Sequence, residues 1–132
     1  MRRFVSLLAL ATALGCGGDS ATNASDTLSG TYTLRSVNGA PLPFTILQID
    51  SLKVEVISDA FTLTDNKTWT RTGANRTTDG SQVTPGVIAD SGTYVLNGSK
   101  ITVISANGST DGTLGGGKLT LTNDAVVAIY QK

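Results

Sequence analysis

Two alternating segments meet at an Asn-Gly pair in Ser91-Gly92-Thr93-Tyr94-Val95-Leu96-Asn97-Gly98-Ser99-Lys100-Ile101-Thr102-Val103. Large apolar residues fall on every second position, which is the period of a half-buried β-strand. Asn97-Gly98 suits a two-residue type I′ turn, because both central residues of that turn need positive φ. The resulting register sets Tyr94 opposite Ile101 and Leu96 opposite Ser99. The stretch therefore predicts an antiparallel hairpin and an all-β fold.

The same period of two recurs on both sides of this hairpin, and no segment after residue 30 has a helical period. We count eight or nine short strands joined by hairpin connections. A single small antiparallel up-and-down β-barrel fits this pattern best, because closing the sheet removes the exposed edges of an open meander. The predicted strands include residues 30–37, 47–58, 60–64, 91–96, 100–103, 119–122 and 125–131.

The connections between strands are predicted from turn residues. Pro41 and Pro43 lack a backbone N–H, so residues 40–43 are expected to form a connection or an edge strand. The turn Asp65-Asn66-Lys67 would set Leu63 opposite Trp69. Residues 73–89 are polar, lack a clear period and contain several turn residues, so we predict a long, mobile loop at one end of the sheet.

The first 15 residues have the parts of an export signal. Arg2 and Arg3 precede an apolar run at 4–14, which is shorter than the roughly 20 residues that a membrane-spanning helix needs. The only cysteine of the chain, Cys16, follows this run. In these features the chain resembles bacterial lipoproteins, which implies cleavage before Cys16 and lipidation of its thiol. The alternative is an ordinary cleavable secretory signal with an incidental cysteine.

Residues 16–29 are predicted to be the lipidated cysteine and a flexible tether. Residues 17–29 contain one large apolar residue and cannot bury enough surface to offset the entropy of ordering. A coil of this length reaches on the order of 20 Å. The tether therefore precedes a barrel domain at 30–132. In the lipoprotein family an Asp after the cysteine favours inner-membrane retention in some bacteria. Gly17 stands there, so the resemblance implies the outer membrane, on its periplasmic or surface face.

Charge and composition argue against several functions. Without Arg2 and Arg3, eight Lys and Arg residues stand against ten Asp and Glu residues, a formal charge of about −2. Nucleic-acid binding needs clustered Lys and Arg, so no nucleic-acid partner is expected. The chain has no histidine, which removes Ser-His, Cys-His and zinc-His sites. Glu55 is expected to face solvent beside Lys53. We therefore predict no catalytic residue, metal or cofactor. The protein is expected to be a monomer.

The apolar face of the predicted barrel supplies the candidate ligand-binding residues. They are Tyr32, Leu34, Trp69, Tyr94, Leu96 and Ile101. No charged residue is assigned to this face, so the ligand is expected to be apolar or amphiphilic. The alternative is that these side chains are core residues and the barrel is a solid interaction module. A cavity well below about 300 Å³ would favour this alternative, because ligand pockets usually exceed that volume.

The opening of the predicted barrel also carries a family resemblance. Gly30-Thr31-Tyr32-Thr33-Leu34 is followed by Val37-Asn38-Gly39 and by Pro41-Leu42-Pro43. This series resembles the start of small bacterial lipocalin-like lipoproteins, with META-type envelope domains as the second choice. The lipocalin-like resemblance implies a barrel that binds a small apolar molecule in its interior.

Overall fold

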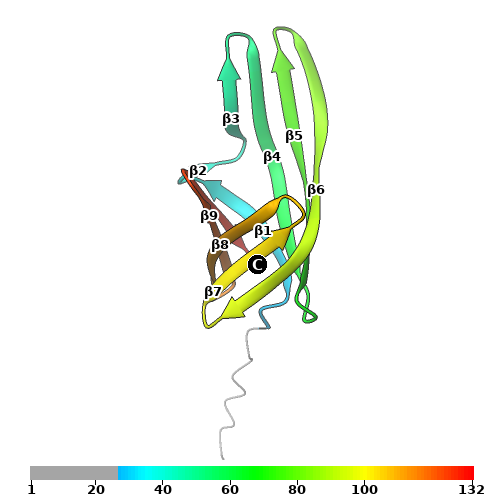
Figure 1. Cartoon of the computed structure of the whole chain (residues 1–132). Coiled ribbons are helices and arrows are strands. Elements are labelled where there is room, and N and C mark those ends of the chain that lie inside the picture. Colours follow the sequence, from blue (N-terminus) through cyan, green and yellow to red (C-terminus); the bar gives the residue numbers. More distant parts are fainter. Residues whose placement is uncertain (1–26) are drawn as a thin grey trace, which may run out of the picture.

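The computed structural model describes residues 27–132, so the predicted signal peptide, Cys16 and most of the predicted tether lie outside the described residues. The described chain is built from β-strands (Figure 1). They are β1 (Gly30–Val37), β2 (Ala40–Pro41), β3 (Phe44–Ile49), β4 (Leu52–Leu63), β5 (Thr68–Asp79), β6 (Gln82–Asn97), β7 (Lys100–Ser105), β8 (Gly108–Gly115), β9 (Lys118–Asn123) and β10 (Val126–Gln131). Within residues 27–132, no helix is long and apolar enough to cross a membrane.

Eight of these strands form a closed antiparallel barrel. Each strand from β4 to β9 pairs with the next strand along the chain, and β1 closes the barrel by pairing with both β10 and β4. Consecutive strands are neighbours, as an up-and-down barrel requires. The predicted fold class is therefore confirmed. The short β2 pairs only with β1 and lies at an edge, as Pro41 predicted, and β3 pairs only with β4.

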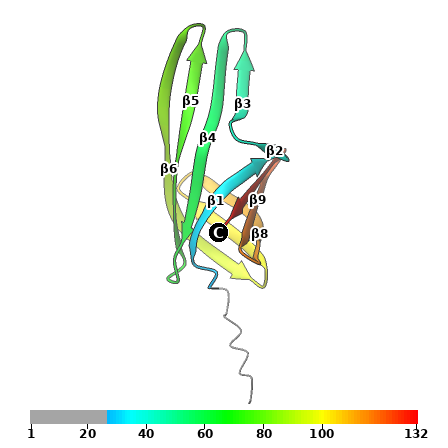
Figure 2. The same cartoon turned by 180° about the vertical axis from the view of Figure 1, so that it is seen from behind.

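Three barrel strands continue far beyond the barrel wall. The distal parts of β4 (52–58), β5 (73–79) and β6 (82–88) form, together with β3, a four-stranded extension that we call the arm. Figures 1 and 2 show it rising well past β7, β8 and β9. Its tips lie at the opposite end of the molecule from the start of β1, because Gly30 pairs with Leu63 at the other end of β4.

The predicted loop at residues 73–89 is wrong. These residues form the distal hairpin of β5 and β6, with Gly73 opposite Ile88 and Asp79 opposite Gln82. Their polar composition reflects a sheet exposed to solvent on much of both faces. Pro85 is tolerated because the distal part of β6 has no partner on its other side.

The boundary between the next two predicted strands is also displaced. The chain turns at Asp50-Ser51, where Asp50 has a φ of 50°, and β4 then runs unbroken to Leu63. A bulge lies between Val56 and Ser58. It adds one residue and lets Val56 face the same side as Asp59 despite the odd spacing.

Tight turns set the register of the remaining hairpins. Both Asn38 and Gly39 have positive φ, as a type I′ turn needs, and Leu63 lies opposite Trp69 as predicted.

The register predicted for the hairpin at 91–103 is wrong by two positions. Asn97 pairs with Lys100, so Gly98-Ser99 is the loop, and only Gly98 has positive φ. This suits a type II′ turn, which needs glycine at its first central position. Tyr94 therefore faces Val103, and Leu96 faces Ile101. A shift of two leaves every side chain on its predicted face, because the side-chain period of a strand is two.

Side chains fill the end of the barrel that lies opposite the arm. Tyr32, Leu63, Ile101 and Leu119 are each almost fully buried. Burial of a large apolar side chain contributes about 1.5–3 kcal/mol, so these residues are a major source of stability. The hydroxyl of Tyr32 donates to the carbonyl of Leu28 at 2.7 Å, and Leu28 packs against the core. The last residues of the predicted tether thus contact the barrel.

Candidate functional site

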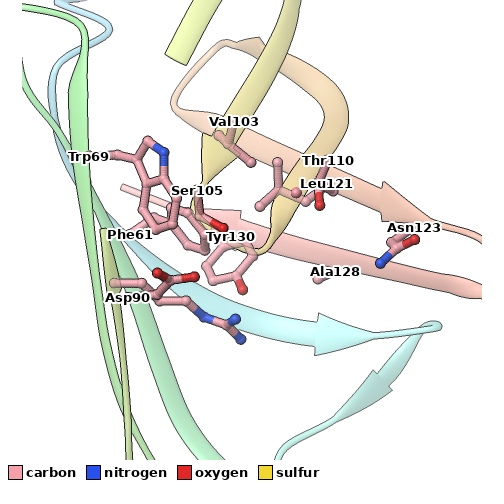
Figure 3. Close-up of a pocket in the computed structure, with 12 residues that line it drawn as sticks. Phe61, Trp69, Asp90, Val103, Ser105, Thr110, Leu121, Asn123, Ala128 and Tyr130 are labelled. Carbon is pink, nitrogen blue, oxygen red and sulfur yellow. The ribbon is translucent and has the colours of Figure 1, made fainter. Parts of the chain in front are cut away.

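A cavity of about 190 Å³ lies at the barrel mouth from which the arm rises (Figure 3). The turns at 106–107 and 124–125 are at the same end. Seven strands contribute to its lining. The lining residues are Phe61, Trp69, Arg71, Asp90, Val103, Ser105, Gly108, Thr110, Leu121, Asn123, Ala128 and Tyr130.

Three aromatic rings form one wall of this cavity. The ring centroids of Phe61 and Trp69 are 5.0 Å apart, and those of Phe61 and Tyr130 are 5.2 Å apart in an edge-to-face arrangement. Figure 3 shows the three rings grouped together, with Asn123 on the far side. Trp69 is only 3% exposed, and its Nε1–H donates to the carbonyl of Thr93 at 2.9 Å. Trp69 is therefore a core residue with one edge at the cavity.

The buried carboxylate of Asp59 contacts two residues that line the cavity, Arg71 and Tyr130. The Asp59 side chain is 1% exposed, and its Oδ2 accepts hydrogen bonds from Arg71 Nε at 2.8 Å and from the Tyr130 hydroxyl at 2.8 Å. Arg71 Nη2 lies 2.6 Å from the same oxygen. Asp59 Oδ1 has no hydrogen-bond partner among the described residues. Burying an unpaired carboxylate would be very costly, because the charge loses its hydration. The ion pair with Arg71 offsets part of this cost.

The pKa shifts follow from this network. Burial raises the pKa of the Tyr130 phenol, and the charge of Asp59 raises it further. Burial alone would lower the pKa of the Arg71 guanidinium, but the hydrogen bond and charge of Asp59 outweigh burial and hold the pKa above its usual value. Tyr130 is therefore a neutral donor, and Arg71 is a permanent cation.

Asp90 is the second carboxylate of this region. It lies opposite Arg71 in the β5–β6 register and lines the cavity, and its Oδ1 accepts the backbone N–H of Ser91 at 2.8 Å. Arg71 makes its ion pair with Asp59, and Asp90 forms no ion pair with any residue of the 27–132 segment. Arg71 and Asp90 line the cavity, and together with the buried Asp59 they carry a net charge of −1.

The structure does not gather the six predicted ligand-binding residues around one cavity. Trp69 lines the cavity, whereas Tyr32, Leu34, Tyr94 and Ile101 are buried in the core. Leu96 is half-buried and packs against that core. The interior positions identified from the alternation are inward-facing, but most of them fill the barrel.

Sequence reasoning missed the charged residues of the inner face. Asp59 alternates with Phe61 and Leu63, and Arg71 alternates with Trp69. Strict application of the two-residue period would have placed both inside. The expectation that no charged residue faces inward is therefore wrong. The ion pair between Asp59 and Arg71 makes their burial possible, and a one-dimensional pattern contains no information about such pairs.

Glu55 also differs from expectation. It is only 5% exposed, and its carboxylate oxygens lie 2.7 Å from Lys53 Nζ and 2.7 Å from Arg76 Nη2. Hydrogen bonds from Lys53 and Arg76 lower the pKa of the Glu55 carboxyl below its usual value. Glu55 lies on the arm, not among the residues that line the cavity. The predicted lipidation site, Cys16, lies outside the described residues.

Comparison with protein-family models, curated proteins and solved structures found no match to this chain. The resemblance to lipocalin-like or META-type lipoproteins therefore stays a prediction. What the geometry contributes is a mostly filled barrel, a small charged mouth cavity and a long exposed arm. Among residues 27–132, no three histidine, cysteine or acidic side chains gather into a potential metal site.

Proposed function

We propose that this protein is a lipid-anchored, non-catalytic interaction module of the bacterial cell envelope, and that its arm binds a partner. One observation carries the proposal. The outermost strand of the arm, β3, exposes Ile46, Leu47 and Ile49 to solvent, with 57%, 42% and 57% of their surfaces accessible. Such a strand binds another extended chain readily, because its unpaired backbone groups and apolar side chains are both accessible.

The two free edges of the arm differ in their protection. The distal edge of β6 contains Pro85, which cannot donate to an added strand. The six residues of β3 include neither a proline nor a charged side chain, and the only irregularity is a bulge between Thr45 and Leu47. Proteins usually protect exposed edges with charges or proline. The unprotected edge of β3 therefore favours a binding role.

The direction of the arm supports a partner away from the anchor. The described chain enters the barrel at the end opposite the arm tips (Figure 1). With lipids on Cys16, the barrel would stand between the membrane and the arm. The arm would then reach away from the anchoring membrane.

The proposed absence of catalysis is consistent with the surroundings of Glu55. Two cations hold this carboxylate in its ionised form, which is unsuited to a general acid near neutral pH. Broad hydrolase screening is expected to find no turnover. A turnover that Glu55→Gln abolishes would contradict this part of the proposal.

An apolar ligand inside the barrel has less support. The cavity of about 190 Å³ is smaller than the roughly 300 Å³ at which ligand pockets usually begin, and charged residues line part of it. We expect the Trp69 emission to stay unchanged across a panel of lipids and hydrophobic probes. A saturable shift, weakened by Trp69→Ala more than stability is lowered, would restore the ligand hypothesis.

Site-specific photo-cross-linking tests the arm. A photoreactive residue at exposed Gln48 in β3 is expected to give a discrete adduct in cells, whereas one at exposed Val95 on the barrel wall is not. Combining Ile46→Lys with Ile49→Lys should remove the adduct, and Val95→Lys should retain it. An adduct of twice the monomer mass would identify the partner as a second copy. Equal adducts at both positions, or none, would contradict the proposal.

Anchoring is tested separately. Mass spectrometry of the native protein is expected to show an N-terminal Cys16 carrying two or three acyl chains. Cys16→Ser should release the protein from the membrane fraction. An unmodified N-terminus beyond residue 16 would support the secretory alternative.

A further inference from the structure

We propose that the mouth cavity binds a primary alkylammonium group. This binding is independent of the arm, so a negative cross-linking result would leave it unaffected. The cavity is about 190 Å³ in volume, which is enough for a short amine but not for a lipid chain. Three features of its walls select this chemistry.

The first feature is the charge of the mouth. Asp59 and Arg71 neutralise each other through contacts of 2.6 and 2.8 Å. Asp90 remains without an ion-pair partner in the described chain, and it lines the cavity. A bound monocation would bring these three side chains to neutrality, and Asp90 is the carboxylate that lines the cavity. The net negative charge of these three side chains therefore favours a cation over an anion.

The second feature is the set of hydrogen-bond acceptors. An ammonium group donates three hydrogen bonds and accepts none. The cavity offers the Asp90 carboxylate, the Asn123 amide oxygen and the hydroxyl oxygens of Ser105 and Thr110. These groups come from β6, β7, β8 and β9, so the barrel wall positions them around one space.

The third feature is the aromatic wall. Phe61 and Tyr130 border the same space as Trp69, and the face of an aromatic ring attracts cations. The fold already uses this attraction, because the Arg71 guanidinium lies 5.6 Å from the centre of the Phe61 ring. Val103 and Leu121 supply an apolar surface for the alkyl chain.

The acceptors do not form a metal site. Calcium needs six to eight oxygen ligands, usually including several carboxylates. Within the described part of the chain, no group of three acidic, histidine or cysteine side chains is present. An organic cation, which combines a charge with an apolar chain, fits the mixed lining better than a bare ion does.

The experiment titrates the purified, full chain in detergent with n-butylammonium chloride at constant ionic strength. Trp69 is the only tryptophan, so its fluorescence reports on the cavity wall. A saturable change is expected with n-butylammonium, but not with butan-1-ol, sodium butyrate or calcium chloride. An equal response to the neutral, anionic or calcium probe, or no saturable response to the amine, would overturn the proposal.

Two variants test the assigned residues. Asp90→Asn keeps the acceptor for Ser91 but removes the charge, and it should weaken amine binding by about tenfold or more. Asp50→Asn removes the same charge at the arm tip and should bind as the wild type does. Thr110→Val removes one acceptor at nearly constant volume and should weaken binding less. Unchanged affinity in Asp90→Asn, at an unchanged melting temperature, would overturn the assignment. If Asp90→Asn does not fold, an unchanged affinity of Thr110→Val for n-butylammonium would overturn the assignment.

Two sources of the ammonium group are distinguished by a second probe, Nα-acetyl-lysine methylamide. Binding of both probes would identify the side chain of a protein-borne lysine as an acceptable ligand. Binding of n-butylammonium alone would limit the site to free amines. Either result supports the site, and failure of both overturns it.

Discussion

Asp59 shows how one buried charge can organise one end of a barrel. Its Oδ2 binds Arg71 from β5 and Tyr130 from β10, so a single oxygen links three strands. Strands β5 and β10 are distant in sequence. In the barrel, β5 lies next to β4, and β10 lies next to β1, which pairs with the other edge of β4. These hydrogen bonds therefore connect the strands on both sides of β1, where the barrel closes, and they hold two of the residues that line the mouth cavity.

We expect Asp59→Ala to destabilise the protein by about 1–3 kcal/mol, because it leaves the buried Tyr130 hydroxyl without its acceptor and the partly exposed Arg71 guanidinium without its ion-pair partner. Asp65→Ala, in an exposed turn, should change the free energy of unfolding by less than about 0.5 kcal/mol. Denaturant unfolding measures both values. Equal effects of the two substitutions would show that the network contributes little.

Gly92 allows a close approach between β6 and β7. A Cβ at this position would lie 1.8 Å from the carbonyl oxygen of Ile104, which accepts a hydrogen bond from Trp69 Nε1 at 3.3 Å. Gly92→Ala should therefore cost about 1–3 kcal/mol through overpacking and shift the Trp69 emission. Gly115→Ala is the control, because a Cβ there meets no atom within 4 Å. Thermal melts that agree for the two variants would contradict this account.

At the scale of elements, the arm has a different composition from the barrel strands that continue into it. The face of the arm that continues the barrel interior carries Leu52, Val54 and Val56 of β4. Of these three residues only Val56 is buried. The arm is held by hydrogen bonding between its strands and by ion pairs such as those of Glu55. Its stability should therefore be lower than that of the barrel, since little apolar surface is removed from water.

Amide hydrogen exchange is expected to divide β5 and β6 into two parts. The amides of the arm parts, at 74–79 and 83–88, should exchange faster than those of the barrel parts, at 68–72 and 92–97. Exchange at neutral pH followed by NMR gives the rates residue by residue. Uniform protection along both strands would mean that the arm and barrel open together.

The ion pairs of the arm predict an acid-dependent term in stability. Hydrogen bonds from Lys53 and Arg76 hold the folded-state pKa of Glu55 below its usual value. The stabilisation is therefore fully present above about pH 4.5 and is lost as the pH falls through the lower folded-state value. Glu55→Gln should flatten the loss of stability between neutral and acidic pH. Arg76→Gln should act in the same direction, and an unchanged pH profile in both variants would contradict the assignment.

At the scale of the whole molecule, closure depends on the two ends of the described chain. β1 lies between β10 and β4, and β10 lies between β1 and β9. Contacts between residues about 100 positions apart must form before the core around Tyr32 and Tyr130 is complete. Such long-range pairing makes folding slow and cooperative.

Deletion of residues 126–132 is expected to abolish cooperative unfolding. It removes the buried Tyr130 and leaves two long, unpaired edges, on β1 and β9. Circular dichroism melts and gel filtration measure the loss. Gln131→Ala, at an exposed position of β10, should retain the wild-type melt. A sharp melt in the deletion variant would mean that the remaining strands close without β10.

The amino-acid sequence by itself determined the strand period, most turns and the barrel class. These properties are local: alternation, glycine and asparagine at positive φ, and proline at an edge act within a few residues. The inward faces of Tyr32, Leu34, Trp69 and Tyr94 follow from that alternation. The hairpin register was wrong by two and still kept these faces, because the period is two.

Only the tertiary structure decided the arm, the filling of the barrel and the charged mouth. Residues 73–89 have no local signal for a strand. They form the distal parts of β5 and β6 because β4 pairs with β5 along its whole length, and β5 pairs in turn with β6. Asp59 and Arg71 can face inward because each neutralises the other across neighbouring strands. Whether inward side chains leave a cavity depends on their volumes around a closed ring, which is a three-dimensional property with no counterpart in a linear pattern.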